Sequence, residues 1–239
     1  MRILRTFVTE PEGCPYLSDR EWRMKYQHLD LLLPGEYDGR LRDGWFKYGA
    51  YLQRPVCLGC RECLSMRVSV NDFTLSRSQR RALEKNADLT VMCTSPPICD
   101  EERVNLHNRY RASQFVERGW SPLHRSLESY YEEFVMGPSV MTEIAIWDAD
   151  EILRAIVLTD VDRESVGGVT HFYDPDWKDR SIGLFAMLQT FALAKQLEKK
   201  WVYLGYYVAG SPTMGYKSQF RPGEVREWDG TWRPLTDGE

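Results

Sequence analysis

Three cysteines separated by two-residue gaps form the strongest chemical pattern in the sequence. They stand in Cys57-Leu-Gly-Cys60-Arg-Glu-Cys63, and Cys14 in Gly13-Cys-Pro-Tyr could supply a fourth thiolate. Such gaps let several thiolates converge on one ion or cluster from a short loop. The pattern predicts a zinc or iron–sulfur site on Cys14, Cys57, Cys60 and Cys63. The alternative is a set of reduced, unligated thiols.

A second polar segment, Phe172-Tyr-Asp-Pro-Asp176, ends an expected strand just before a helix. Aromatic and carboxylate side chains at such a strand end lie where ligands commonly bind in sheets with flanking helices. Arg180-Ser181 then opens the helix, whose free N–H groups suit a phosphate. The plainer interpretation is a capped helix beside a surface Asp-Pro turn.

Three further segments carry weaker signals. Arg77, Arg80 and Arg81 stand among serines and a glutamine, a mixture that suits phosphate contacts but also a solvated helix capped by Ser76 or Ser78. Tyr203 and Tyr206 flank Gly205, which marks a bulge or a close backbone approach in a strand; a packed aromatic core explains them nearly as well. Lys217 lies among aromatic residues near the C-terminus.

The elements that must position these residues follow a regular order. We expect helices over 101–118 and 125–136, and then strands over 141–147, 152–161 and 166–173 joined by short turns as an antiparallel meander. Ser181 caps a helix reaching Lys200, and a strand follows over 201–207. The order strand, strand, strand, helix, strand predicts an α+β protein with the mixed sheet and flanking helices of the GNAT-like (N-acetyltransferase-like) fold.

The chain divides into two expected parts. Residues 1–90 hold the cysteine cluster, an irregular stretch punctuated by glycine and proline, and a basic segment. Residues 90–100, with two prolines and two cysteines, read as a connector. Residues 101–239 form the expected catalytic domain.

Composition sets the class of protein and its compartment. The 239 residues are 43% hydrophobic and 13% aromatic, which is globular composition. No apolar run is long enough to cross a bilayer and the first residues do not read as a signal peptide, so we expect a cytoplasmic protein without a membrane partner. The net charge is −4, so an RNA partner would need a local basic surface such as 67–85 or 103–125.

Taken in order, seven segments resemble the arginyltransferase family, and specifically its bacterial branch, the aspartate/glutamate leucyltransferases. The resemblance runs from about Cys14 to Trp232, and it departs where Phe46-Lys-Tyr-Gly49 replaces two arginines before a small residue and glycine. The segments that carry it are Gly13–Leu17, Arg54–Cys63, Arg77–Arg81, Phe172–Asp176, Arg180–Gly183, Tyr203–Tyr206 and Met214–Lys217.

The resemblance implies transfer of leucine or arginine from charged tRNA to proteins that begin with Asp or Glu, which marks them for degradation. It implies a GNAT-like catalytic half, no cofactor for the chemistry itself, and a metal cluster on the N-terminal cysteines of eukaryotic relatives. The reaction is aminolysis of an ester, so positioning dominates.

On this hypothesis the candidate residues take separate roles. Asp174 or Asp176 orients the acceptor amine. Arg180 and Ser181 hold a phosphate near the tRNA 3′ end. The aminoacyl and terminal-adenosine pocket is assigned to Tyr173, Tyr203 and Tyr206, and contacts with the tRNA backbone or the acceptor's acidic side chain to Arg77, Arg80, Arg81 and Lys217.

Two other functions compete with this one. An acetyl-coenzyme A-dependent N-acetyltransferase would share the fold, but Phe185 stands where its pyrophosphate loop carries a glycine. A metal-dependent module that senses redox state or holds tRNA would bind RNA without modifying a peptide.

Overall fold

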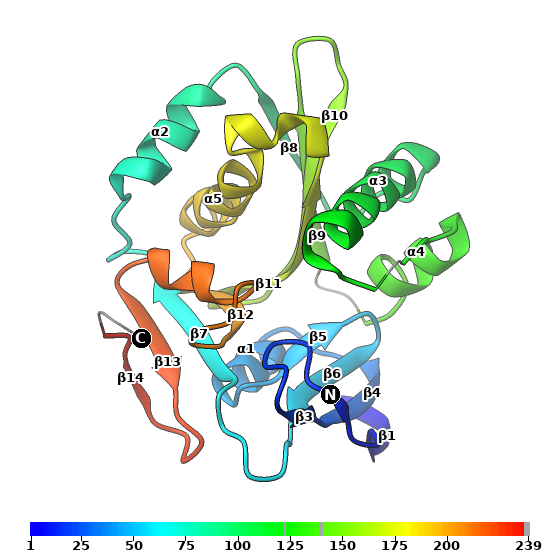
Figure 1. Ribbon diagram of the computed structural model, residues 1–239, viewed down its shortest axis with the longest axis vertical. Coiled ribbons are helices and arrows are strands. Elements are labelled where there is room, and N and C mark those ends of the chain that lie inside the picture. The colour runs from blue at the N-terminus through cyan, green and yellow to red at the C-terminus, as the bar shows by residue number, and fades with distance from the viewer. Residues whose placement is uncertain (122, 139–140, 237–239) are drawn as a thin grey trace.

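The computed structural model describes residues 1–121, 123–138 and 141–236 and contains two main sheets with helices on their faces (Figure 1). The N-terminal elements are β1 (Arg2–Val8), β2 (Glu12–Gly13), β3 (Glu21–Trp22), β4 (Met24–Leu31), α1 (Glu36–Arg42), β5 (Phe46–Tyr48), β6 (Tyr51–Pro55), β7 (Leu64–Ser69) and α2 (Arg77–Lys85). Then follow β8 (Thr90–Thr94), α3 (Glu101–Arg118), α4 (Leu127–Phe134), β9 (Met141–Trp147), β10 (Leu153–Val161), β11 (Ser165–Tyr173) and η1 (Pro175–Arg180). The chain ends with α5 (Ile182–Gln196), β12 (Trp201–Tyr207), η2 (Gly215–Gln219), β13 (Gly223–Arg226) and β14 (Trp232–Pro234).

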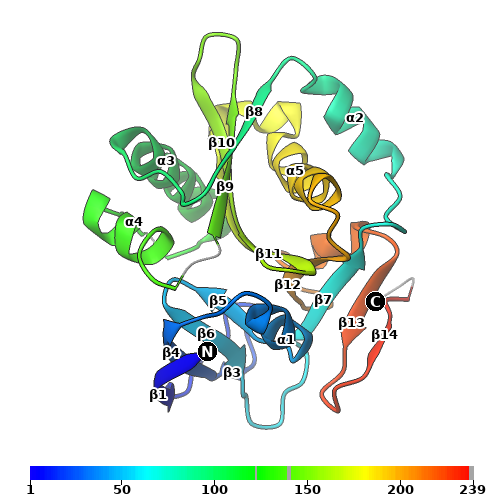
Figure 2. The same cartoon turned by 180° about the vertical axis from the view of Figure 1, so that it is seen from behind.

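The larger sheet is mixed and has eight strands in the order β14-β13-β7-β12-β11-β10-β9-β8. The predicted meander is confirmed, because β10 pairs antiparallel with both β9 and β11. α3 and α4 cover one face of these strands, and α5 covers the other with α2 beside it, as the two opposite views show (Figures 1 and 2). The prediction of an α+β protein with a mixed sheet and flanking helices is confirmed.

Two expectations about the N-terminal half are wrong. The stretch expected to be irregular contains an antiparallel four-stranded sheet in the order β1-β4-β6-β5. Residues 90–94, expected in a connector, form β8 at the edge of the larger sheet. The strand escapes recognition because its side chains are mostly exposed, so it lacks the alternation that a half-buried strand shows.

The helix before β12 also differs from the expectation. It spans Ile182–Gln196 rather than reaching Lys200, and Ser181 makes no side-chain capping bond. Ser181 instead has φ of 58°, in the left-handed region, at the sharp join between η1 and α5.

The two sheets meet through a shared core. Leu29, Trp45 and Leu52 of the smaller sheet and its loops pack against Tyr203 of β12. β7, from the N-terminal half, lies between β12 and β13 in the larger sheet. Among the described residues, no helix is both long and apolar enough to span a bilayer.

Candidate functional site

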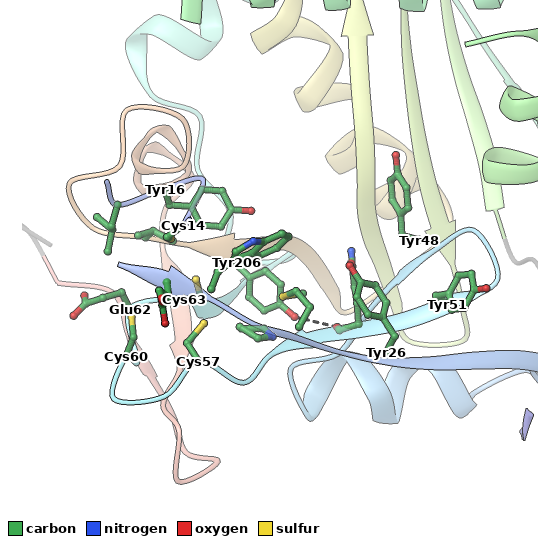
Figure 3. A pocket seen from close by; sticks show the side chains of 17 residues that line it. Cys14, Tyr16, Tyr26, Tyr48, Tyr51, Cys57, Cys60, Glu62, Cys63 and Tyr206 are labelled. Atoms are coloured by element: carbon green, nitrogen blue, oxygen red, sulfur yellow. Dashed lines mark hydrogen bonds between the residues drawn. The ribbon is translucent and has the colours of Figure 1, made fainter. Parts of the chain in front are cut away.

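A pocket of about 330 Å³ lies where the smaller sheet meets the end of β12 and the cysteine loop (Figure 3). Its cysteines gather at one end, Tyr26, Tyr48 and Tyr51 stand at the other, and Tyr206 lies between them. The remaining lining comes from β3, β4, β6 and the loop after β2. The described lining residues are Cys14, Tyr16, Leu17, Glu21, Trp22, Met24, Tyr26, Tyr48, Tyr51, Gln53, Pro55, Cys57, Cys60, Glu62, Cys63, Tyr206 and Val208.

Tyr206 fixes the two sheets together beside this pocket. Its hydroxyl lies 3.1 Å from both the Gly44 and the Gln53 carbonyl oxygen, to which it donates, and its ring meets Phe46 edge-on at 4.9 Å. Burial raises the pKa of Tyr206 well above its usual value, so the phenol stays neutral. Tyr206 therefore lines the pocket and links β12 to the smaller sheet.

The pocket is aromatic with an acidic edge. Glu21 and Glu62 are the charged side chains among its described lining residues, and no Arg or Lys lines it. Aromatic rings attract cations through their faces, and carboxylates add to that attraction. The lining therefore suits an ammonium or apolar group better than an anion.

The four predicted metal ligands share this pocket. Burial, followed by the neighbouring thiols Cys57, Cys14 and Cys60, raises the pKa of Cys63 to about 12. Within the described part of the chain, however, no group of three or more His, Cys, Asp and Glu side chains has a spacing that would hold a metal ion. As placed, the thiols do not fit a bound metal. The zinc or iron–sulfur site stays a prediction, and absence of both metals from anaerobically purified protein would contradict it.

A charge cluster occupies the end of β11. The Asp174 carboxylate accepts hydrogen bonds from Arg109 Nη2 at 2.7 Å and from Arg154 Nη1 at 2.6 Å. It also accepts from the Asp176 backbone N–H at 3.2 Å and so caps η1. Arg154 continues the chain of alternating charge to Asp148, with Nε 2.7 Å from Oδ2. The Asp174 side chain is only 1% exposed, so this geometry favours a positioning role.

Tyr173 packs beside this cluster on the start of α5. Its ring lies against Tyr110, with centroids 4.9 Å apart. A Cβ at Gly183 would stand 2.7 Å from the Tyr173 ring, so only glycine permits this contact without a shift. Gly183 therefore serves helix–ring packing here.

β11 and β12 separate after a short stretch of pairing. They pair in parallel only from Ser165 to Gly167 and from Trp201 to Tyr203. Beyond that point Gly205 forms a bulge with φ of 82°, and the Lys217 ammonium group lies beside it. Lys217 Nζ donates to the Tyr206 carbonyl oxygen at 2.6 Å. A buried lysine amine thus stands at the strand that lines the pocket.

Replacing Lys217 with methionine should alter how stability depends on pH. Burial lowers the pKa of Lys217 from 10.5 to about 7. Between these values the unfolded state holds one more proton than the folded state, so the free energy of unfolding of the wild type rises with pH in that window. The slope from this group is about 1.4 kcal/mol per pH unit, and Lys217→Met loses it.

Urea unfolding of both proteins from pH 7 to pH 10 measures this difference. Other titrating groups cancel in the comparison. Parallel stability curves for the two proteins would contradict the assignment of a buried, easily deprotonated Lys217.

The other predicted site residues lie elsewhere. Arg77, Arg80 and Arg81 are exposed on α2 beyond a capping box at Ser76. Arg180 pairs with Asp88 and lies over the Trp177 ring at 4.7 Å. The structure thus brings the cysteines together with Tyr206, and Tyr173 together with Asp174 and Asp176.

Tyr203 and Lys217 complete the set of predicted site residues. Tyr203 is buried edge-on against Trp232, with ring centroids 5.8 Å apart. Lys217 lies behind the pocket wall, where its ammonium group contacts the Tyr206 carbonyl oxygen. Both residues therefore hold β12 in place rather than facing the pocket.

The sequence interpretation missed the tyrosines of the smaller sheet and both arginine partners of Asp174. Tyr26 and Tyr51 lie in β4 and β6, which were not expected as strands. A period of two in Met24, Tyr26 and His28 was an available signal. For Arg109 and Arg154 no local signal exists, because their partner is distant in the chain.

Comparisons with known proteins agree over nearly the whole chain. A family model described as arginine-tRNA-protein transferase, C terminus, matches residues 102–227, and the corresponding N-terminus model matches residues 12–81. A protein from Ruegeria pomeroyi named aspartate/glutamate leucyltransferase is 37% identical, over 98% of this chain and 85% of its own length. A protein of the same name from Campylobacter jejuni (strain ATCC 700819 / NCTC 11168) is 32% identical, over 92% of this chain and 91% of its own length.

A solved structure supports the fold. The crystal structure of FemX superposes with a TM-score of 0.54 at 8% identity, covering 81% of this chain and 66% of that one. At this identity the similarity concerns the fold alone.

Proposed function

The chain belongs to the arginine-tRNA-protein transferase family, and we propose that it moves leucine from leucyl-tRNA to the N-terminal amine of proteins that begin with Asp or Glu. The named relatives that span nearly the whole chain support leucine as the donor. We place the reaction in the cytosol, where the new N-terminus marks the acceptor for degradation.

One observation carries the location of the reaction. β11 and β12 separate after Gly167 and Tyr203, and residues beyond that point, Tyr206 and Val208, line the pocket. Strand ends where a sheet opens beside flanking helices are common ligand sites, and here the opening adjoins the strand that lines the pocket. We therefore assign the acceptor amine to the pocket and the ester of the charged tRNA to the opening between the strands.

The chemistry asks little of the protein beyond positioning. The α-amine attacks the ester carbonyl, the C–O bond to the tRNA ribose breaks, and the ribose oxygen takes up a proton as the amine loses one. An α-amine has a pKa of roughly 7.7–8.0, so a useful neutral fraction exists near neutral pH. Holding both reactants in line supplies much of the rate, and backbone donors at the open strand edge would stabilise the oxyanion.

Mass spectrometry tests this proposal directly. A peptide that begins with Asp is incubated with the protein and a pool of charged tRNAs, and separately with acetyl-coenzyme A. We expect the mass of one leucine residue to be added in the first reaction only. Addition of an arginine residue would correct the donor, whereas addition of an acetyl group, or of nothing, would contradict the proposed function.

A further inference from the structure

The tyrosine wall of the pocket continues into a row of rings on the smaller sheet. Phe7 of β1 pairs with Tyr26 of β4, and their rings stack at 5.3 Å. His28 of β4 pairs with Tyr51 of β6, and these rings stack at 4.8 Å. Tyr51 meets both Phe7 and Tyr26 edge-on at 6.2 Å. We call Phe7, Tyr26, His28 and Tyr51 the aromatic row.

The sheet does not need this face for its own core. Leu29 and Leu52, 2% and 0% exposed, bury the opposite face. The rings of the aromatic row remain partly accessible, and Tyr51 keeps 37% of its surface exposed. Contiguous accessible aromatic surface of this kind is characteristic of a binding face.

The row is continuous with the pocket that receives the amine. Tyr26 and Tyr51 belong to both, whereas Phe7 and His28 lie outside the pocket lining. The row crosses three neighbouring strands, a width of about 10 Å at the usual strand spacing, which an extended peptide covers with about three residues. If the first residue of a peptide occupies the pocket, the residues that follow it in the peptide would therefore lie over the aromatic row.

Charge indicates the class and direction of that ligand. The pocket end carries Glu21 and Glu62, which attract an ammonium group and repel phosphate. At the outer end the Arg5 guanidinium lies 5.2 Å from the centre of the Phe7 ring and forms no ion pair within the described chain. The pocket end therefore fits the N-terminal ammonium group of a polypeptide better than the phosphodiester end of tRNA, and it requires the carboxylate of the acceptor's first residue to point away from Glu21 and Glu62.

We propose that the aromatic row is a docking track for the acceptor polypeptide. It takes apolar or aromatic side chains at the second to fourth residues, behind the terminus that enters the pocket. The inference rests on the proposed function and adds that the enzyme prefers acceptors with apolar or aromatic residues after the first one.

Two peptides of equal length, Asp-Tyr-Leu-Tyr and Asp-Ser-Gly-Ser followed by the same tail, test the preference with leucyl-tRNA as donor. We expect the wild type to show a KM about tenfold lower for the aromatic peptide, since tenfold corresponds to about 1.4 kcal/mol, the contribution expected of one or two ring contacts. Phe7→Ala and, independently, His28→Ala should raise that KM toward the value for the Ser/Gly peptide. The KM values for the Ser/Gly peptide and for leucyl-tRNA should not change.

Val8→Ala is the matched control, because Val8 neighbours Phe7 in β1, is 43% exposed and points to the other face. Circular dichroism and melting of each variant monitor the fold. Equal KM values for both peptides in the wild type would overturn the docking track while leaving the proposed function intact. A rise in the KM for leucyl-tRNA in Phe7→Ala would assign the row to RNA instead. Failure of the wild type to modify either peptide would overturn the proposed function itself.

Discussion

Asp174→Ala is expected to lower turnover on the order of 100-fold and the free energy of unfolding by about 3 kcal/mol. Removing one partner of a buried ion pair leaves an uncompensated charge and costs about 3–5 kcal/mol. Most of the loss in stability comes from the pair with Arg154, whose side chain is 16% exposed. The pair with Arg109 contributes less, because Arg109 is 52% exposed and solvent screens its charge. Turnover falls because the end of β11 and the start of α5 lose their common anchor, and a small misplacement of the reactants can cost that much even when the substitution lies away from the chemistry.

Asp174→Asn separates positioning from direct participation in the reaction. The amide keeps one oxygen acceptor for a guanidinium or for the η1 cap, so a positioning role predicts intermediate losses of stability and activity together. An inactive Asn variant with wild-type stability would instead show that the carboxylate contacts the substrate. Asp176→Asn is the control, because its side chain is 82% exposed and, among the described residues, its ion pair is with Arg109. Urea unfolding and steady-state kinetics measure both quantities.

Asp160→Ala is expected to lower the free energy of unfolding by about 3–5 kcal/mol. Lys47 Nζ lies 3.0 Å from Asp160 Oδ1, and the two side chains are 1% and 0% exposed. The pair joins β5 of the smaller sheet to β10 of the larger one. Without the carboxylate, the Lys47 ammonium group would stay buried, and the acceptor left to it among the described residues would be the Gly49 carbonyl oxygen at 3.4 Å.

The double variant Lys47→Met/Asp160→Leu tests the physical reason. Replacing a buried ion pair by apolar groups of similar volume is often neutral or stabilising. We expect the double variant to recover most of the stability that Asp160→Ala loses, measured by urea unfolding. Single variants within about 1 kcal/mol of the wild type would contradict the assignment of this pair as a main tie between the sheets.

The regular half of the fold could be predicted because its patterns are local. The helix over 101–118 and the strands over 141–147 and 201–207 have the expected bounds. The smaller sheet was missed because glycines and prolines crowd the connections between its strands, and because the mostly exposed side chains of β1 give no clear alternation. β8 was missed because an exposed edge strand beside two prolines carries no periodic signal.

The candidate site was predictable in part. Cys57, Cys60 and Cys63 could be grouped from their spacing, and the pocket that they share with Tyr206 lies at their end of the smaller sheet. Tyr26 and Tyr51 reach the same pocket because β4 and β6 pair in the smaller sheet, and that pairing could not be read from the sequence. The exposure of Lys217 could not be read from the sequence, because a cation among aromatic residues is equally consistent with a surface or a buried position.

The place of β7 in the larger sheet constrains how the protein is made. Both strands that flank it, β12 and β13, are synthesised long after it leaves the ribosome. Until then β7 presents two bare hydrogen-bonding edges, and its Met66 and Val68 lack the partners that bury them. A chain terminated before β12 would therefore leave β7 unpaired, and an unpaired strand of this kind is a site of aggregation.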